Sequence, residues 1–185
     1  MEFTPHKFYH VYNQGNNRQK IFHPETDEYI FFLKQVRRHV LPHVDIVAYC
    51  LMPNHFHFML RTDERCLKMR MSGKIEINQV SFGFKSLLST YTLIANKRRG
   101  STGSIFRQGT HARCLNDEPL PYHADKANQD DLNNVFRYIH ENPVESHLVR
   151  SPADWEYSSY RDYAGLRNGT LVNKKVAFDF GFGSI

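Results

Sequence analysis

Residues 44–60 constrain the fold of this chain more than any other stretch of the sequence. Residues 44–52 are almost continuously apolar, which is typical of a strand in the middle of a sheet. Pro53-Asn54 supplies a two-residue turn, and residues 55–60 then read His-Phe-His-Phe-Met-Leu. The pattern predicts two antiparallel strands joined as a hairpin, with side chains alternating between the two faces of the second strand.

Elements on either side of this hairpin complete a sheet. Residues 8–14 are aromatic and β-branched and predict a first strand, and residues 111–114 predict a fourth. Apolar side chains at helical spacing predict one helix after Pro24 and a second over residues 82–99. The order β-α-β-β-α-β predicts an α+β fold: a ferredoxin-like antiparallel sheet with helices on one face.

A C-terminal helix that carries Tyr138 is expected after the fourth strand. Asp130 or Asp131 is placed to cap a helix over residues 132–141, which Pro143 stops or kinks. A short segment that opens at Pro152 follows. Residues 62–78 are polar and predict irregular structure.

The length of 185 residues suits one domain, 1–185, with a core at about 8–164 and a C-terminal tail at 165–185. The N-terminus does not resemble a secretory signal, and the longest apolar run, 46–52, is too short to span a bilayer. We therefore expect a cytoplasmic protein that has no membrane partner.

A formal net charge of +5 and a pI near 9.1 suit a polyanionic partner such as nucleic acid, although solvated helix faces would explain the same charge. The basic residues form three clusters: Lys34, Arg37, Arg38; Arg65, Lys68, Arg70; and Lys97, Arg98, Arg99. The three cysteines are scattered without C-x-x-C spacing, so they indicate neither a zinc knuckle nor a disulfide framework.

His55 and His57 stand at positions i and i+2 of a predicted strand, so both imidazoles project from one face while Phe56 points into the core. Their Cα atoms would lie roughly 6.5–7 Å apart, close enough for both rings to bind one metal ion. The alternative is a pair of partly exposed sheet histidines. A zinc-hydrolase H-x-H-x-D-H pattern is absent, because Met59 and Leu60 occupy its last two positions.

Tyr138 and Asn142 are four residues apart and share one face of the predicted C-terminal helix. A phenol becomes a useful nucleophile when a nearby cation activates its target, and an amide oxygen beside two imidazoles would suit Mg²⁺ or Mn²⁺. The alternative is that Tyr138 is a half-buried core aromatic and Asn142 only a residue near the helix end.

Several motifs in the same order resemble those of a known family, the single-tyrosine HUH transposases, where HUH denotes His-hydrophobic-His. Within that family the chain is most similar to the REP-associated tyrosine transposases and their insertion-sequence relatives. The resemblance spans about residues 8–163. The motifs are Tyr9-His10-Val11 with residues 15–22, residues 49–57, residues 105–109, residues 138–144, and Trp155-Glu156-Tyr157-Ser158-Ser159-Tyr160.

The resemblance implies a single-stranded DNA endonuclease and strand transferase that forms a covalent 5′-phosphotyrosine at hairpin-associated sites. It implies Tyr138 as the nucleophile, His55 and His57 as metal ligands, and Asn142 as a polar group that completes or borders the site. The implied cofactor is Mg²⁺ or Mn²⁺. Insertion-sequence relatives form homodimers and some REP-associated relatives are monomers, so both states stay open, as does the role of the unusual stretch at 66–73.

Backbone phosphates of the DNA would be bound by cationic side chains, and unpaired bases by aromatic ones. The candidate cations are Arg18, Lys20, Arg98, Arg99, Arg107 and Arg113. Two other functions remain as alternatives: a non-catalytic or domesticated nucleic-acid-binding protein of the same fold, and a zinc-dependent hydrolase.

Overall fold

The computed structural model describes residues 1–23, 25–116 and 124–183. Its centre is a four-stranded sheet in the order β2-β3-β1-β6, in which every neighbouring pair is antiparallel. The strands are β1 (Phe8–Gln14), β2 (Asp45–Met52), β3 (His55–Arg61) and β6 (His111–Cys114). This is the strand order of the ferredoxin-like fold, and the predicted fold class is confirmed.

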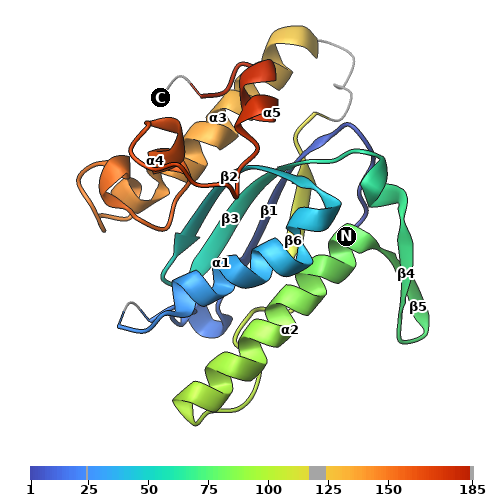
Figure 1. Ribbon diagram of the computed structural model, residues 1–185, viewed down its shortest axis with the longest axis vertical. Coiled ribbons are helices and arrows are strands. Elements are labelled where there is room, and N and C mark those ends of the chain that lie inside the picture. The colour runs from blue at the N-terminus through green and yellow to red at the C-terminus, as the bar shows by residue number, and fades with distance from the viewer. Residues whose placement is uncertain (24, 117–123, 184–185) are drawn as a thin grey trace.

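Helices cover both faces of the sheet (Figure 1). On one face lie α1 (Glu28–His39) and α2 (Gln79–Arg99), as the sequence predicts. On the other lie α3 (Ala124–Glu145), which carries Tyr138, and α5 (Lys174–Asp179). No helix among the described residues is long and apolar enough to cross a membrane.

The predicted hairpin forms β2 and β3, with Met52 opposite His55 across the Pro53-Asn54 turn. Phe56 and Phe58 are fully buried in the apolar cluster under α1 and α2. Met59 belongs to the second cluster, under α3. Alternation along β3 therefore turns His55 and His57 toward the α3 face.

Residues 62–78 differ from the prediction of irregular structure. They form a short 3₁₀ turn, Glu64–Leu67, and a separate hairpin of β4 (Met69–Ser72) and β5 (Ile75–Asn78). Met69, Met71 and Ile75 are at least half exposed. Residues 69–72 and 75–78 do alternate apolar with polar side chains around a turn at Gly73-Lys74, so a signal for this hairpin was present in the sequence.

The limits of α3 also differ from the prediction. The helix begins at Ala124, so Asp130 and Asp131 lie within it and cannot cap it. It continues through Pro143 to Glu145. A proline in the last turn removes only one helical hydrogen bond, and the Ser146 and Leu148 amides donate to the carbonyls of Asn142 and Pro143.

The segment after Gly165, expected as a polar tail, carries α5 and packs against the sheet. Leu171 and Val172 are buried in the first apolar cluster, and Ala177 and Phe182 in the second. Two short elements precede it, the 3₁₀ turn Pro152–Asp154 and α4 (Tyr160–Tyr163).

The contact between α1 and α2 predicts that Gly83→Ala lowers the free energy of unfolding by about 1–3 kcal/mol. A Cβ atom at Gly83 would lie 2.2 Å from the His39 carbonyl oxygen, so the helices would have to separate. Urea denaturation measures the change. Ser89→Ala, at an exposed position of the same helix, should change stability by less than about 0.5 kcal/mol. Equal stability of the two variants would contradict the close packing.

Candidate active site

Polar side chains are concentrated on the sheet face that α3 partly covers. His55 and His57 come from β3, and His10 and Tyr12 come from the same face of β1. Tyr12 lies directly opposite His57 in the antiparallel register. The edge strand β6 extends this row, since His111 pairs with Tyr12.

The two predicted metal ligands converge. The ring centroids of His55 and His57 are 4.8 Å apart, with ring planes at 84°. Asn142, buried on α3, places its Oδ1 atom 3.3 Å from His55 Nε2. Residues 55, 57 and 142, far apart in the sequence, thus come together in one place.

Each imidazole has a protein partner on its Nδ1 atom. His55 Nδ1 is 2.6 Å from Asn54 Oδ1, and His57 Nδ1 is 2.9 Å from His10 Nε2. When both Nδ1 atoms carry the proton and donate it, both Nε2 lone pairs are free. Metal-binding histidines in proteins are commonly oriented by such a second hydrogen bond.

Burial keeps these histidines neutral near pH 7. It lowers the pKa of His57 well below its ordinary value and that of His10 to about 4. Burial also lowers the pKa of His55, while Asn142 Oδ1, which can accept a hydrogen bond from the protonated ring, has the opposite effect on this pKa. Neutral imidazole is the form that binds a metal ion.

The donor set fits a divalent cation. His57 Nε2 is buried and has no hydrogen-bond partner within the described part of the chain. Two imidazole nitrogens and one amide oxygen form a mixed set that Mg²⁺ or Mn²⁺ accepts. Among the described residues no three His, Cys, Asp or Glu side chains are grouped to bind a metal, and the polar side chain that reaches His55 Nε2 is the Asn142 amide.

Tyr138 stands over this pair within the same chain. Its ring centroid is 5.4 Å from that of His57 and 6.2 Å from that of His10. The side chain is 39% exposed, so it is not the core aromatic of the alternative interpretation. With His10, His57 and Arg113 it lines a cavity of about 520 Å³.

A buried hydrogen-bond network fixes α3 on the sheet beside Tyr138. His140 Nε2 lies 2.7 Å from Ser159 Oγ, which also accepts the Tyr49 amide of β2 at 2.9 Å. His140 and Ser159 are almost completely buried, and burial lowers the pKa of His140 to about 3. Ile139, fully buried, packs into the cluster beneath the helix. These contacts set the position of the phenol.

The six candidate DNA-binding cations lie in different places. Arg113 lines the cavity with Tyr138. Arg18 and Lys20 are exposed in the segment after β1, which packs on the Pro53 carbonyl just before His55. Arg98 pairs with Asp27, and Arg99 with the buried Glu28, on the side of the sheet covered by α1 and α2.

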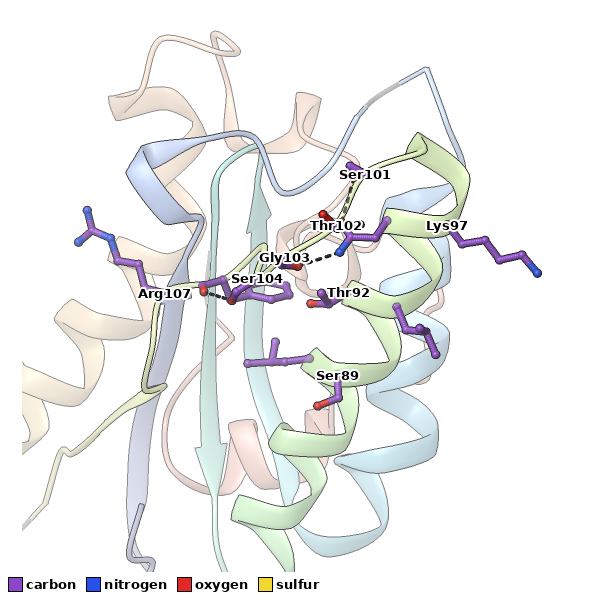
Figure 2. A pocket seen from close by; sticks show the side chains of 12 residues that line it. Ser89, Thr92, Lys97, Ser101, Thr102, Gly103, Ser104 and Arg107 are labelled. Carbon is purple, nitrogen blue, oxygen red and sulfur yellow. Dashed lines mark hydrogen bonds between the residues drawn. The ribbon is translucent and has the colours of Figure 1, made fainter.

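Arg107 borders a second cavity, of about 780 Å³, between α2 and the following loop. Figure 2 shows that Arg107 and Lys97 extend away from this cavity in opposite directions, while Ser89, Thr92 and Ser104 line it. The titratable side chains at this cavity therefore do not converge, and its lining surface is more apolar than polar.

Sequence reasoning did not find the roles of His10, Asn54, Tyr12 or His111. The signal for His10 and Tyr12 was present, because they alternate along β1 as His55 and His57 alternate along β3. The contact between His10 and His57 depends on which strands are neighbours, and the sequence alone does not show that.

Fold and site together define an α+β domain that presents two sheet histidines to a helix-borne tyrosine. No model of a known protein family matches the sequence, and no curated protein matches it. Among solved structures, the chain is similar to a REP-associated tyrosine transposase bound to a REP hairpin. The TM-score is 0.59 and the identity 17%, over 94% of this chain and 92% of that one.

Acid should destabilise the metal-free protein. Unfolded histidines take up protons near pH 6.5, whereas in the folded protein the pKa of His10 is about 4 and that of His140 about 3. Their contribution to stability is complete above pH 6.5 and is lost as the pH falls toward 4. Between these pKa values, each of the two histidines lowers the free energy of unfolding by about 1.4 kcal/mol for each pH unit of acidification. Urea denaturation in EDTA from pH 7 to 5 measures the loss, and constant stability over that range would contradict it.

Proposed function

We propose that this protein is a single-stranded DNA endonuclease and strand transferase, a transposase that acts at hairpin-associated sites with Tyr138 as its nucleophile. The observation that carries the proposal is the position of the Tyr138 ring, 5.4 Å from that of His57 in the same chain. The phenol is exposed, while the Nε2 atom of His57 beside it has no partner within the described residues.

In the proposed reaction, Tyr138 Oη attacks the scissile phosphorus in line. The P–O3′ bond breaks as the P–O(Tyr) bond forms, the phenolic proton is lost, and the leaving 3′-oxygen gains a proton. The products are a 5′-phosphotyrosine and a free 3′-hydroxyl. A second 3′-hydroxyl can attack the phosphotyrosine and rejoin the strand. Because one phosphodiester replaces another at each step, ATP is not needed.

The residues that would bind the cofactor, Mg²⁺ or Mn²⁺, are His55, His57 and Asn142. When bound, the cation would stabilise negative charge on the scissile phosphate. Asn54 Oδ1 and His10 Nε2 would each accept a hydrogen bond from the Nδ1–H group beside them, which leaves Nε2 of both imidazoles for the cation. The network of His140 and Ser159 holds Tyr138 above them.

The proposed partner is single-stranded DNA with a hairpin, the class of ligand named for the similar solved structure. Arg113 is the cation best placed for a phosphate near Tyr138, and Arg18 and Lys20 lie beside the end of β3 that carries His55. A homodimer is not required for this chemistry, since the phenol and imidazoles meet within one chain.

A non-catalytic nucleic-acid-binding protein is the second candidate, because the same fold and basic surface would serve it. A zinc hydrolase is disfavoured because Met59, where that pattern requires a carboxylate, is fully buried in the core. Covalent chemistry separates the first two candidates.

Incubation with hairpin-bearing single-stranded DNA and Mn²⁺ should give a protein–DNA adduct that survives SDS electrophoresis. Tyr138→Phe should abolish the adduct, because it removes the attacking oxygen. Tyr160→Phe, which changes a partly exposed tyrosine on α4, should retain it. An adduct that persists in Tyr138→Phe would contradict the assignment, and tight DNA binding without any adduct across varied hairpins would favour plain binding.

Metal affinity tests the ligand set independently of catalysis. His57→Ala and Asn142→Ala should weaken Mn²⁺ binding in calorimetry, because each removes a donor atom. His10→Ala should weaken it roughly 10- to 100-fold without removing a ligand, since His10 orients His57. His6→Ala changes an exposed histidine paired with Glu64 and should have no effect. Unchanged affinity in all three site variants would exclude a metal site here.

A further inference from the structure

The polar sheet face stays accessible toward the edge strand β6, where His111 and Arg113 are exposed. The helix packs mainly on β2 and β3, and it meets β1 and β6 at the His10–Tyr138 contact and the Arg113–Asp131 ion pair. Toward this edge stand Tyr12, His111 and Arg113, which point to the same side as His57 because of the strand register. Ala112 points the other way and packs against the core under α1 and α2.

The aromatic rings form a series that leads out of the catalytic cavity. The centroids of His57 and Tyr12 are 5.9 Å apart, with ring planes at 37°. Tyr12 and His111 are stacked, with centroids 5.1 Å apart and planes at 16°. Tyr12 is partly buried and His111 is exposed at the open edge of the sheet. The inner end of the stack is thus partly buried and its outer end is accessible.

A cation lies beside this stack. Arg113 follows two residues after His111 on the same face and lines the cavity that Tyr12 and Tyr138 share. Its ion pair with Asp131 is long, at 3.6 Å, and the Arg113 side chain is 56% exposed. A pair of this kind contributes little to stability, so a phosphate can replace the carboxylate as the partner of Arg113.

We propose that Tyr12, His111 and Arg113 form a subsite, the stacking platform, for one unpaired nucleotide of the strand whose phosphate reaches Tyr138. Its base would extend the Tyr12–His111 stack and a flanking phosphate would bind Arg113. This inference rests on the proposed function, because that strand must leave the cavity across this face. Both faces of a base inside a duplex are covered by its neighbours, so the subsite selects unpaired nucleotides.

The role is positioning of the strand, separate from the chemistry at Tyr138. Aromatic stacking depends little on sequence because every base has a ring face, and Arg113 reads only the phosphate. The platform therefore provides affinity for single-stranded DNA of any sequence. Sequence recognition has to come from other contacts.

The parent protein of the test is the full chain carrying Tyr138→Phe, measured in EDTA, so that neither cleavage nor metal contributes to the result. The probe is a fluorescent oligo-dT, and anisotropy gives its affinity. His111→Ala should weaken binding roughly 5- to 150-fold, the range for loss of one stacked base, and His111→Phe should restore it. Arg113→Gln should weaken binding. It should also reduce the slope of the logarithm of affinity against the logarithm of salt concentration by about 1, the amount expected for one lost phosphate contact.

Two controls separate stacking from general loss of structure or charge. His147→Ala, an exposed histidine after the end of α3, should bind oligo-dT like the parent. Binding of a blunt duplex should be the same for His111→Ala and the parent. On irradiation, an oligonucleotide that carries 5-iodouracil should become crosslinked to the peptide that contains Tyr12 or His111.

Three outcomes would overturn the platform: oligo-dT affinity within twofold of the parent in His111→Ala, equal losses for duplex and single strand, or crosslinks only elsewhere in the chain. Failure of the proposed function would look different. The wild-type protein would then form no covalent adduct, while the platform variants still lost affinity for the oligonucleotide.

Discussion

The antiparallel register of β3 against β1 is the constraint on which the rest of the site depends. It places Tyr12 opposite His57 and brings His10 to His57 Nδ1, while the intervening Phe56 and Phe58 fill the opposite core. A slip of one residue would exchange these faces and bury the imidazoles among α1 and α2. The apolar cost of exposing two phenylalanines opposes that slip, so the hydrophobic core itself specifies where the polar groups stand.

The second requirement is that α3 be held at one height above this face. Ile139 supplies the apolar contact, and the His140–Ser159 pair supplies a buried polar contact that reaches the backbone of β2. Buried hydrogen bonds of this kind are costly to break, because a lone buried donor or acceptor is left unpaired. Ile139 and His140 thus fix the helix on the sheet. Helical periodicity then places Tyr138, four residues before Asn142, on the side that faces the cavity.

Local periodicity made much of this fold and site predictable. The two-residue repeat placed His55 and His57 together and turned Phe56 inward, and the helical repeat paired Tyr138 with Asn142. Contacts between distant segments were not predictable in the same way. The Lys97-Arg98-Arg99 run suggested phosphate binding, yet Arg99 neutralises the buried Glu28, and charge patterns do not distinguish a solvated cation from a paired one. The β4–β5 hairpin was missed although residues 69–72 and 75–78 alternate apolar with polar side chains, and what the sequence does not show is that Met69, Met71 and Ile75 are exposed.

The central claim is that two imidazoles, one amide oxygen and a phenol surround a single cation within one chain. Anomalous diffraction from crystals grown with Mn²⁺ tests it most directly. We predict one strong peak within bonding distance of His55 Nε2, His57 Nε2 and Asn142 Oδ1, with the Tyr138 hydroxyl of the same chain close beside it. A protein that binds no Mn²⁺ there, or binds it only at other residues, would contradict the account.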